Sequence, residues 1–135
     1  MDKVKLKLLL KKYNMKHFLI DIDGTICDDI KNEDSHLYII AKPIEGSIEQ
    51  INQWYDEGHT ITFFTAREEK DRGVTVFWLD NQKVKYHGLI MNKPRCINED
   101  DEYVWIDNRF VRGVTYKGIW GNLKEVVKNI LTFGD

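Results

Sequence analysis

The feature that most constrains the fold is a short apolar run, HFLIDI at residues 17–22, which carries two carboxylates near its end. A nearly continuous apolar run of this length is typical of a strand that is buried on both faces of a parallel sheet. The acids Asp21 and Asp23, followed by Gly24-Thr25, stand where this strand gives way to a loop. Because parallel strands need crossover connections, the rest of the chain should alternate strands with helices.

Two helices have recognisable ends in the sequence. One begins at Ser47, the N-cap of a capping box with Gln50, and stops at Gly58. The other covers residues 122–131, where Asn122 is the cap and apolar residues recur at helical spacing. Both segments are therefore predicted to pack one apolar face against the sheet.

The remaining elements follow the same alternation. A third helix begins at Glu68-Glu69, since acids are favourable in a first helical turn, and its apolar face is predicted to contain Val74, Phe77 and Trp78. Further strands are predicted at residues 60–65, 88–91, 103–107 and, at an edge of the sheet, 115–120.

This order predicts an α/β fold with a three-layer, Rossmann-like parallel sheet of about five strands and no large cap domain. Residues 15–135 form a single predicted domain, in which the polar stretch 27–43 is a short flap or loop insertion. Residues 1–14 are a basic N-terminal extension, and their pattern suits either an amphipathic helix packed on the domain or on a sister subunit, or a strand. The oligomeric state stays open.

The composition excludes several other classes of protein. With 42% hydrophobic and 31% charged residues, the 135-residue chain is typical of a globular domain rather than a disordered one. No apolar run approaches the roughly 18 residues of a membrane span. Cys27 and Cys96 lack the spacing of a metal site, and no stretch resembles an export signal, so we expect reduced thiols and a cytoplasmic protein.

Polar side chains follow four of the predicted strands. In an open parallel sheet, ligands bind beyond the carboxyl ends of the strands. The residues expected at that rim, in chain order, are Asp21 and Asp23; Thr65, Ala66 and Arg67; Lys93; and Asp107 with Asn108. Clustered acids either share protons or bind a hard cation such as Mg²⁺, and the whole set suits phosphoryl transfer.

Four motifs in this order resemble those of the haloacid dehalogenase superfamily. They are DIDGT after the first strand, FFTAR at the end of the second, a Lys before Pro, and WIDNR at the end of the fourth. The resemblance covers roughly residues 15–131. The short insertions make the chain similar to the small capless phosphatases of that superfamily.

The resemblance implies a role for each catalytic residue. Asp21 would be the nucleophile and a metal ligand, and Asp23 the general acid and base, with its main-chain carbonyl on Mg²⁺. Thr65 would hold the phosphoryl group, and Lys93 would orient both nucleophile and phosphate. These four residues are the predicted catalytic set.

The resemblance also implies the substrate contacts and the rest of the metal site. Ala66 would present its N–H to the phosphoryl group, and Arg67 is open between a substrate contact and a surface charge. Asp107 would complete the metal site with Asp21 and Asp23. Many relatives carry a second acid where this chain has Asn108, which removes a charge from the metal site.

The function expected from these residues is a Mg²⁺-dependent phosphomonoester hydrolase that works through an aspartyl-phosphate. Its substrate would be a small phosphorylated metabolite, a sugar phosphate or a nucleotide. Three alternatives stay open: a phosphoacceptor domain like a signalling receiver, a catalytically weakened phosphate-binding domain, and a polynucleotide end phosphatase. Nothing in the sequence specifically supports contact with nucleic acid.

Overall fold

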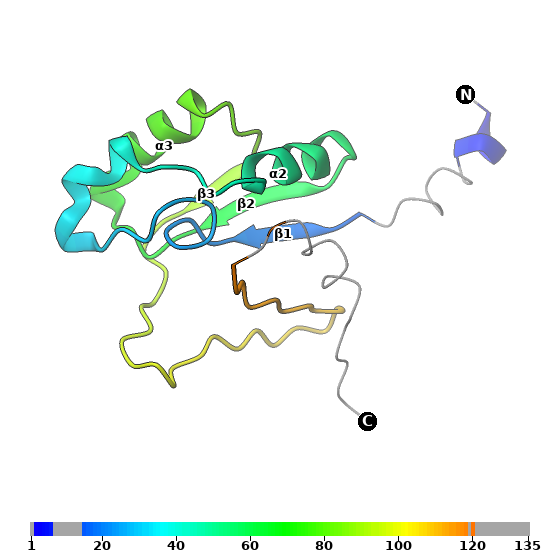
Figure 1. Ribbon diagram of the computed structural model, residues 1–135. Helices are drawn as coiled ribbons and strands as arrows, with labels where there is room; N and C mark the ends of the chain where they lie inside the picture. The colour runs from blue at the N-terminus through cyan, green and yellow to red at the C-terminus, as the bar shows by residue number, and fades with distance from the viewer. Residues whose placement is uncertain (1, 7–14, 119, 121–135) are drawn as a thin grey trace.

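The computed structural model describes residues 2–6, 15–118 and 120. Its centre is a parallel sheet with the strand order β1-β2-β3, shown in Figure 1. The strands are β1 (His17–Ile20), β2 (Thr60–Phe64) and β3 (Gly88–Ile90). The predicted α/β class and parallel pairing are confirmed, with three strands rather than five in the described part of the chain.

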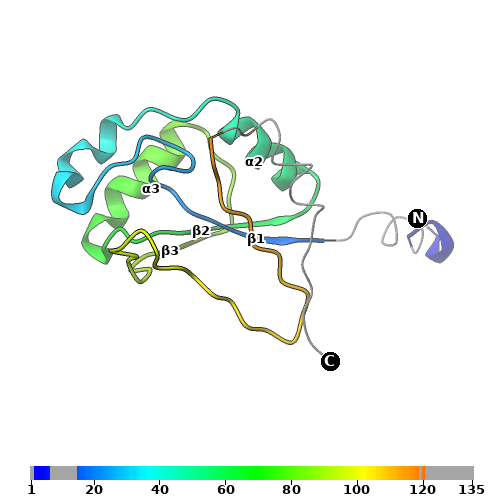
Figure 2. The ribbon, with the colours of Figure 1, turned by 60° about the horizontal axis from the view of Figure 1, so that its bottom comes forward.

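Each crossover between strands contains one α-helix and one 3₁₀ segment. The first contains η1 (Asn32–Ile40) and α2 (Ser47–Asp56), and the second contains η2 (Glu69–Asp71) and α3 (Arg72–Asn81). Figures 1 and 2 show α2 and α3 over the same face of the sheet. The described residues contain no cap domain, as predicted, and none of their helices is long and apolar enough to cross a membrane.

The side-chain alternation of the strands explains why one face is covered. Phe18 pairs with Ile61 and Ile20 pairs with Phe63, so these residues share the face under the helices. Phe18 stacks on Trp54 of α2 at 4.1 Å between ring centroids. Leu19, which lies between these two residues in β1, is 41% exposed on the other face of the sheet. The prediction that the first strand is buried on both faces is therefore wrong, and the described residues show a helical layer on one face only.

The start of α2 differs from the predicted capping box. Gly46, in the left-handed conformation at φ 83°, is the N-cap, and no side chain caps the helix. The hydroxyl oxygen of Ser47 instead lies within hydrogen-bond distance of the carbonyls of Ile44 and Ile26, at 2.7 and 3.1 Å. Ser47 thus ties the helix to the loop after β1. The predicted end is confirmed: α2 stops at Asp56, and Gly58 follows with φ 98°.

The helix α3 begins later than predicted, because the acidic residues form the separate turn η2. Its buried face contains Thr75, Trp78 and Leu79, whereas Phe77 is 57% exposed. The indole of Trp78 donates to the carbonyl of Ala41 at 2.8 Å, which fastens α3 to the segment after η1. The buried face of α3 therefore differs from the face that the apolar spacing predicted.

The predicted strands at 103–107 and 115–120 are not strands in the described residues. The first is an unpaired and exposed segment, in which Ile106 is 82% exposed. Strand propensity shows only that residues suit a pleated surface, and no neighbouring strand pairs with this segment. Trp120 is buried, and its indole donates to the carbonyl of Thr25 at 2.7 Å. The predicted helix at 122–131 and residues 7–14 of the extension lie outside the described residues, while residues 3–6 are helical.

Candidate functional site

A tight turn after β1 presents both acids of the first motif. Ile22, which lies between Asp21 and Asp23, is fully buried. Its carbonyl accepts from the N–H groups of Thr25 and Ile26, at 3.0 and 2.9 Å. Gly24 has φ 80°, a left-handed backbone conformation that residues with a Cβ rarely adopt. The turn therefore requires glycine, and the two acids lie on either side of the buried residue Ile22.

Asp21 is bound by a lysine that is distant in the sequence. The Lys93 ammonium donates to Asp21 Oδ1 at 3.0 Å, and the Thr25 hydroxyl donates to Oδ2 at 3.0 Å. The Asp21 side chain keeps 39% of its surface exposed, whereas that of Lys93 keeps 11%. The carboxylate is thus oriented by two donors and still open to solvent.

The main chain holds Lys93 beside Thr65. The N–H of Lys93 donates to the carbonyl of Thr65 at 2.9 Å, and the N–H of Thr65 donates to the carbonyl of Ile90 at 3.0 Å. The ammonium also lies 4.9 Å from the ring centre of Tyr103 and 5.6 Å from that of Phe64. The structure thereby brings the lysine and the threonine of the predicted catalytic set together at the ends of β2 and β3.

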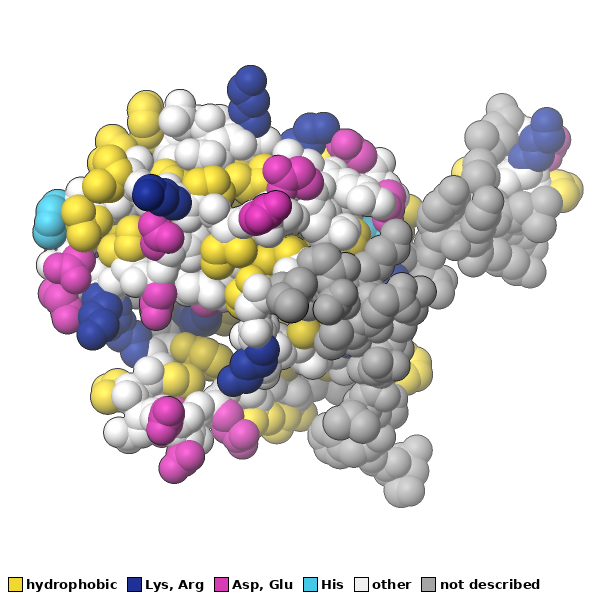
Figure 3. All heavy atoms as spheres, viewed as in Figure 1, with side chains coloured by type: hydrophobic (Ala, Val, Ile, Leu, Met, Phe, Trp, Pro, Cys, Tyr) yellow, Lys and Arg dark blue, Asp and Glu magenta, His cyan; other side chains and the backbone are white. Residues whose placement is uncertain are grey.

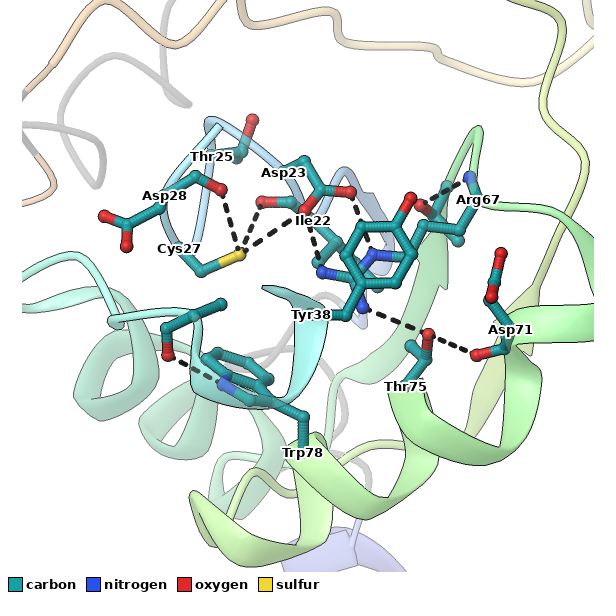
Figure 4. A network of polar contacts seen from close by, with 12 residues as sticks. Ile22, Asp23, Thr25, Cys27, Asp28, Tyr38, Arg67, Asp71, Thr75 and Trp78 are labelled. Carbon is teal, nitrogen blue, oxygen red and sulfur yellow. Dashed lines mark hydrogen bonds and ion pairs between the residues drawn. The ribbon is translucent and has the colours of Figure 1, made fainter. Parts of the chain in front are cut away.

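Asp23 is bound by a different cation, Arg67. The guanidinium donates to Asp23 Oδ2 through Nε at 2.9 Å and to Oδ1 through Nη2 at 2.7 Å, as Figure 4 shows. Its Nη1 donates to the hydroxyl of Thr75 at 3.1 Å. Burial alone would lower the pKa of Arg67, but the hydrogen bonds and charge of Asp23 outweigh it, so the pKa lies above its usual value. The arginine has no exposed surface and faces the acid rather than the open rim.

Tyr38, which the sequence did not single out, covers the arginine. Its ring centre lies 3.8 Å from the guanidinium carbon of Arg67, and its hydroxyl donates to Asn32 Oδ1 at 2.9 Å. The Asn32 amide donates in turn to the carbonyl of Ala66 at 3.1 Å. Burial, and then the charge of Asp23, raise the pKa of the Tyr38 phenol to about 12. Only a tertiary contact identifies this residue, because no spacing in η1 points to the site.

The thiol of Cys27 lies beneath the site without facing the rim. It is fully buried, and its sulfur lies 3.8 Å from Asp23 Oδ1. Burial, followed by the charge of Asp23, raises the pKa of this thiol to about 12. A thiol with such a pKa stays protonated and unreactive, so Cys27 contributes to the packing of the core rather than to the chemistry of the site.

Asp107 is not brought together with the two acids of the first motif. It is exposed, and its carboxylate accepts from the indole of Trp105 at 3.2 Å and from the N–H of Arg109 at 3.0 Å. Among the described residues, no three Asp, Glu, His or Cys side chains are grouped so that they could hold a metal ion. Carboxylate and main-chain carbonyl oxygens, such as those of Asp21 and Asp23, are the kind of ligand that Mg²⁺ takes, usually beside several waters.

The acids of the site are paired with basic side chains. Each acid of the DIDGT motif has its own basic partner, Lys93 for Asp21 and Arg67 for Asp23. Figure 3 shows acidic and basic side chains mixed over one face of the molecule, without a large area of a single sign. An open carboxylate beside an ammonium and a buried hydroxyl can bind and attack an electrophilic group that carries negative oxygens.

Comparisons with known proteins give the fold but no activity. No protein-family model matches the chain, and no curated protein matches it. The crystal structure of a structural-genomics target from Vibrio cholerae is similar, with a TM-score of 0.56 and 24% sequence identity, over 84% of this chain and 98% of that chain. The fold and this likeness define the class of the protein as a small α/β protein with a parallel sheet.

Proposed function

We propose that this protein is a Mg²⁺-dependent phosphomonoesterase that forms an aspartyl-phosphate on Asp21. One observation carries the proposal: the Asp21 carboxylate is held by Lys93 at 3.0 Å and remains 39% exposed at the carboxyl end of the sheet. A carboxylate that is oriented but accessible suits a nucleophile. The proposed substrate is a small phosphorylated metabolite, a sugar phosphate or a nucleotide.

The first half of the reaction transfers the phosphoryl group to the protein. Asp21 attacks phosphorus, and the bond from phosphorus to the ester oxygen breaks. Asp23 enters this step protonated and transfers its proton to the departing ester oxygen, which leaves the Asp23 carboxylate ionised. The Lys93 ammonium and the Thr65 hydroxyl stabilise the negative phosphoryl oxygens as charge moves in the transition state.

The second half of the reaction returns the protein to its starting state. Asp23, now ionised, accepts a proton from a water molecule as that water attacks the phosphorus of the aspartyl-phosphate. The bond from phosphorus to the Asp21 oxygen breaks, and inorganic phosphate leaves. Mg²⁺, bound by Asp21 and the Asp23 carbonyl, would offset the negative charge of the phosphate.

The decisive experiment measures phosphate release from a panel of sugar phosphates, nucleotides and p-nitrophenyl phosphate, with Mg²⁺ and with EDTA. We expect Mg²⁺-dependent turnover by the wild type, and a loss of at least about 10³-fold in Asp21→Asn and in Asp23→Asn. Asp80→Asn, an exposed acid of α3, is the matched control and should keep full activity. Substantial activity in both site variants would refute the proposal.

A catalytically weakened phosphate-binding domain is the second candidate. The position of Asp107 favours it, because this acid lies exposed and bonded to its own neighbours rather than beside Asp21. If Asp107 serves the metal during turnover, Asp107→Asn should raise the Mg²⁺ concentration for half-maximal activity by about tenfold. A wild type that binds phosphate and Mg²⁺ without turnover would instead support the second candidate.

The same panel, extended by a 3′- and a 5′-phosphorylated oligonucleotide, separates the remaining alternatives. A stable phosphorylated form without turnover would indicate a receiver-like phosphoacceptor. Faster hydrolysis of a 3′- or 5′-phosphorylated oligonucleotide than of any small ester would indicate a polynucleotide end phosphatase.

A further inference from the structure

The proposed reaction assigns no role to one buried cation, the guanidinium of Arg67. Arg67 has no exposed surface, yet three of its nitrogens are bonded to side chains, two to Asp23 and one to Thr75. A bidentate pair fixes the plane of the carboxylate as well as its distance, which a single hydrogen bond does not. The orientation of Asp23 is therefore set by a residue from the loop after β2.

The surroundings of Arg67 prevent it from turning toward a ligand. On one side the Tyr38 ring covers the guanidinium at 3.8 Å, a contact that is stronger when the cation is removed from water. On the main chain, the N–H of Arg67 donates to the Thr65 hydroxyl at 3.1 Å, and its carbonyl accepts from Asn92 at 2.8 Å. The arginine is thus anchored at both ends.

The contact from Tyr38 is itself fastened to the site. Tyr38 bonds to Asn32, and Asn32 bonds to the carbonyl of Ala66, the neighbour of Arg67. These contacts close a ring between η1 and the end of β2, and Figure 4 shows the tyrosine lying across the arginine. The segment 27–43, predicted as a flap, therefore holds the arginine in place in this structure.

We propose that Arg67 is a positioning residue that acts through Asp23, and that Tyr38 keeps the Arg67 guanidinium in register with that carboxylate. The inference rests on the proposed function, in which Asp23 protonates the leaving oxygen and later activates water. The two acids of the first motif are then divided by their partners, since Lys93 orients Asp21 toward phosphorus and Arg67 orients Asp23 for proton transfer.

A purely structural role is the competing explanation, because removing one member of a buried ion pair destabilises a protein in any case. Leaving-group dependence separates the two explanations. Proton donation matters more for an ester with a basic leaving oxygen than for one with an acidic leaving group. A defect in Asp23 orientation should therefore affect phenyl phosphate more than p-nitrophenyl phosphate, whereas lost folding affects both equally.

The experiment compares kcat/KM for these two esters, because kcat/KM reports the step in which the leaving group departs. Arg67→Lys keeps the positive charge but cannot form the bidentate pair of hydrogen bonds. In this variant we expect kcat/KM to fall about 10²-fold with phenyl phosphate and about threefold or less with p-nitrophenyl phosphate. Arg72→Lys, the same change at a partly exposed arginine of α3, should leave the ratio of the two values unchanged.

A second pair of variants tests the role of Tyr38. It also replaces the first test if Arg67→Lys does not fold. Tyr38→Leu should reproduce the selective loss with phenyl phosphate, and Tyr38→Phe, which keeps the ring over the guanidinium but loses the hydrogen bond to Asn32, should show a smaller selective loss. Equal losses for both esters, or no loss, in folded Arg67→Lys and Tyr38→Leu would overturn the positioning role alone. A wild type that hydrolyses neither ester, nor any member of the panel, would instead refute the proposed function and with it the role of Arg67.

Discussion

Arg67 and Asp23 lie 44 positions apart in the sequence, yet the buried arginine and the partly buried acid form an ion pair with donor–acceptor distances of 2.7 and 2.9 Å. The neighbouring acid, Asp21, has a separate partner in Lys93, which lies 72 positions away. A motif of two acids one residue apart is therefore split by the fold into two different environments. One carboxylate is open and bound by a lysine, and the other is held in a fork by a buried arginine.

Lys93 provides the first prediction. If its ammonium stabilises charge beside Asp21, Lys93→Gln should lower kcat/KM by about 10²–10³-fold, the usual cost of removing one donor to a charged transition state. Lys85→Gln removes an exposed lysine that is paired with Asp56 at 2.8 Å, and it should keep wild-type activity. Steady-state kinetics on both purified variants decide the point, and equal losses in the two would contradict a specific role for Lys93.

The two cysteines should differ in reactivity. Cys27 is buried with its pKa raised to about 12, whereas Cys96 is exposed. A thiol titration at pH 8 with Ellman's reagent should therefore count one cysteine in the native protein and two after denaturation. In Cys96→Ser the native count should fall to zero, and rapid labelling of that variant would show that Cys27 is accessible.

His59 should make the fold sensitive to acid. It directly precedes β2, and its Nδ1 accepts from the N–H of Lys16 at 3.1 Å, which requires an unprotonated Nδ1. Burial, and then the charge of Lys16, lower the pKa of His59 below its usual value of 6.5, although Glu57 opposes the shift. The unfolded chain therefore binds a proton before the folded protein does as the pH falls below about 6.5.

The free energy of unfolding should accordingly decrease from about pH 6.5 downward, by at most about 1.4 kcal/mol per pH unit for this one group. Urea denaturation of the wild type and of His59→Asn at several pH values measures the effect, which should be smaller in the variant. His36→Asn, at an exposed position of η1, is the matched control and should keep the wild-type dependence. Identical pH dependence in wild type and His59→Asn would contradict the assignment.

Two glycines should respond in opposite directions to the same substitution. Gly24 has φ 80° in the turn between the acids and the loop, so Gly24→Ala should cost about 1–2 kcal/mol of stability. Gly73 lies in α3, and a Cβ there would meet no atom within 4 Å, so Gly73→Ala should be neutral or stabilise by up to about 1 kcal/mol. Thermal or urea denaturation of the two variants tests the difference, and a stabilising Gly24→Ala would show that this turn does not require glycine.

Much of the fold could be predicted because its signals are local. The strands predicted at 17–22 and 60–65 are present as β1, over residues 17–20, and β2, over residues 60–64. Gly58 follows α2 with the left-handed backbone that ends a helix. The failures depended on tertiary contacts. Ser47 bonds to the preceding loop instead of capping α2, and residues 103–107 have strand-like composition without a neighbouring strand to pair with.

For the candidate site, the sequence by itself determined which chemical groups are available: two acids on a Gly24 turn, a threonine after β2 and a lysine after β3. Their placement follows from strand ends, since the carboxyl ends of parallel strands meet at one edge of a sheet. Only the tertiary structure decided how these groups are paired. The fork from Arg67 to Asp23 and the Tyr38 ring over it depend on how η1 packs against the end of β2, and no short-range pattern encodes a contact between segments so far apart in the chain.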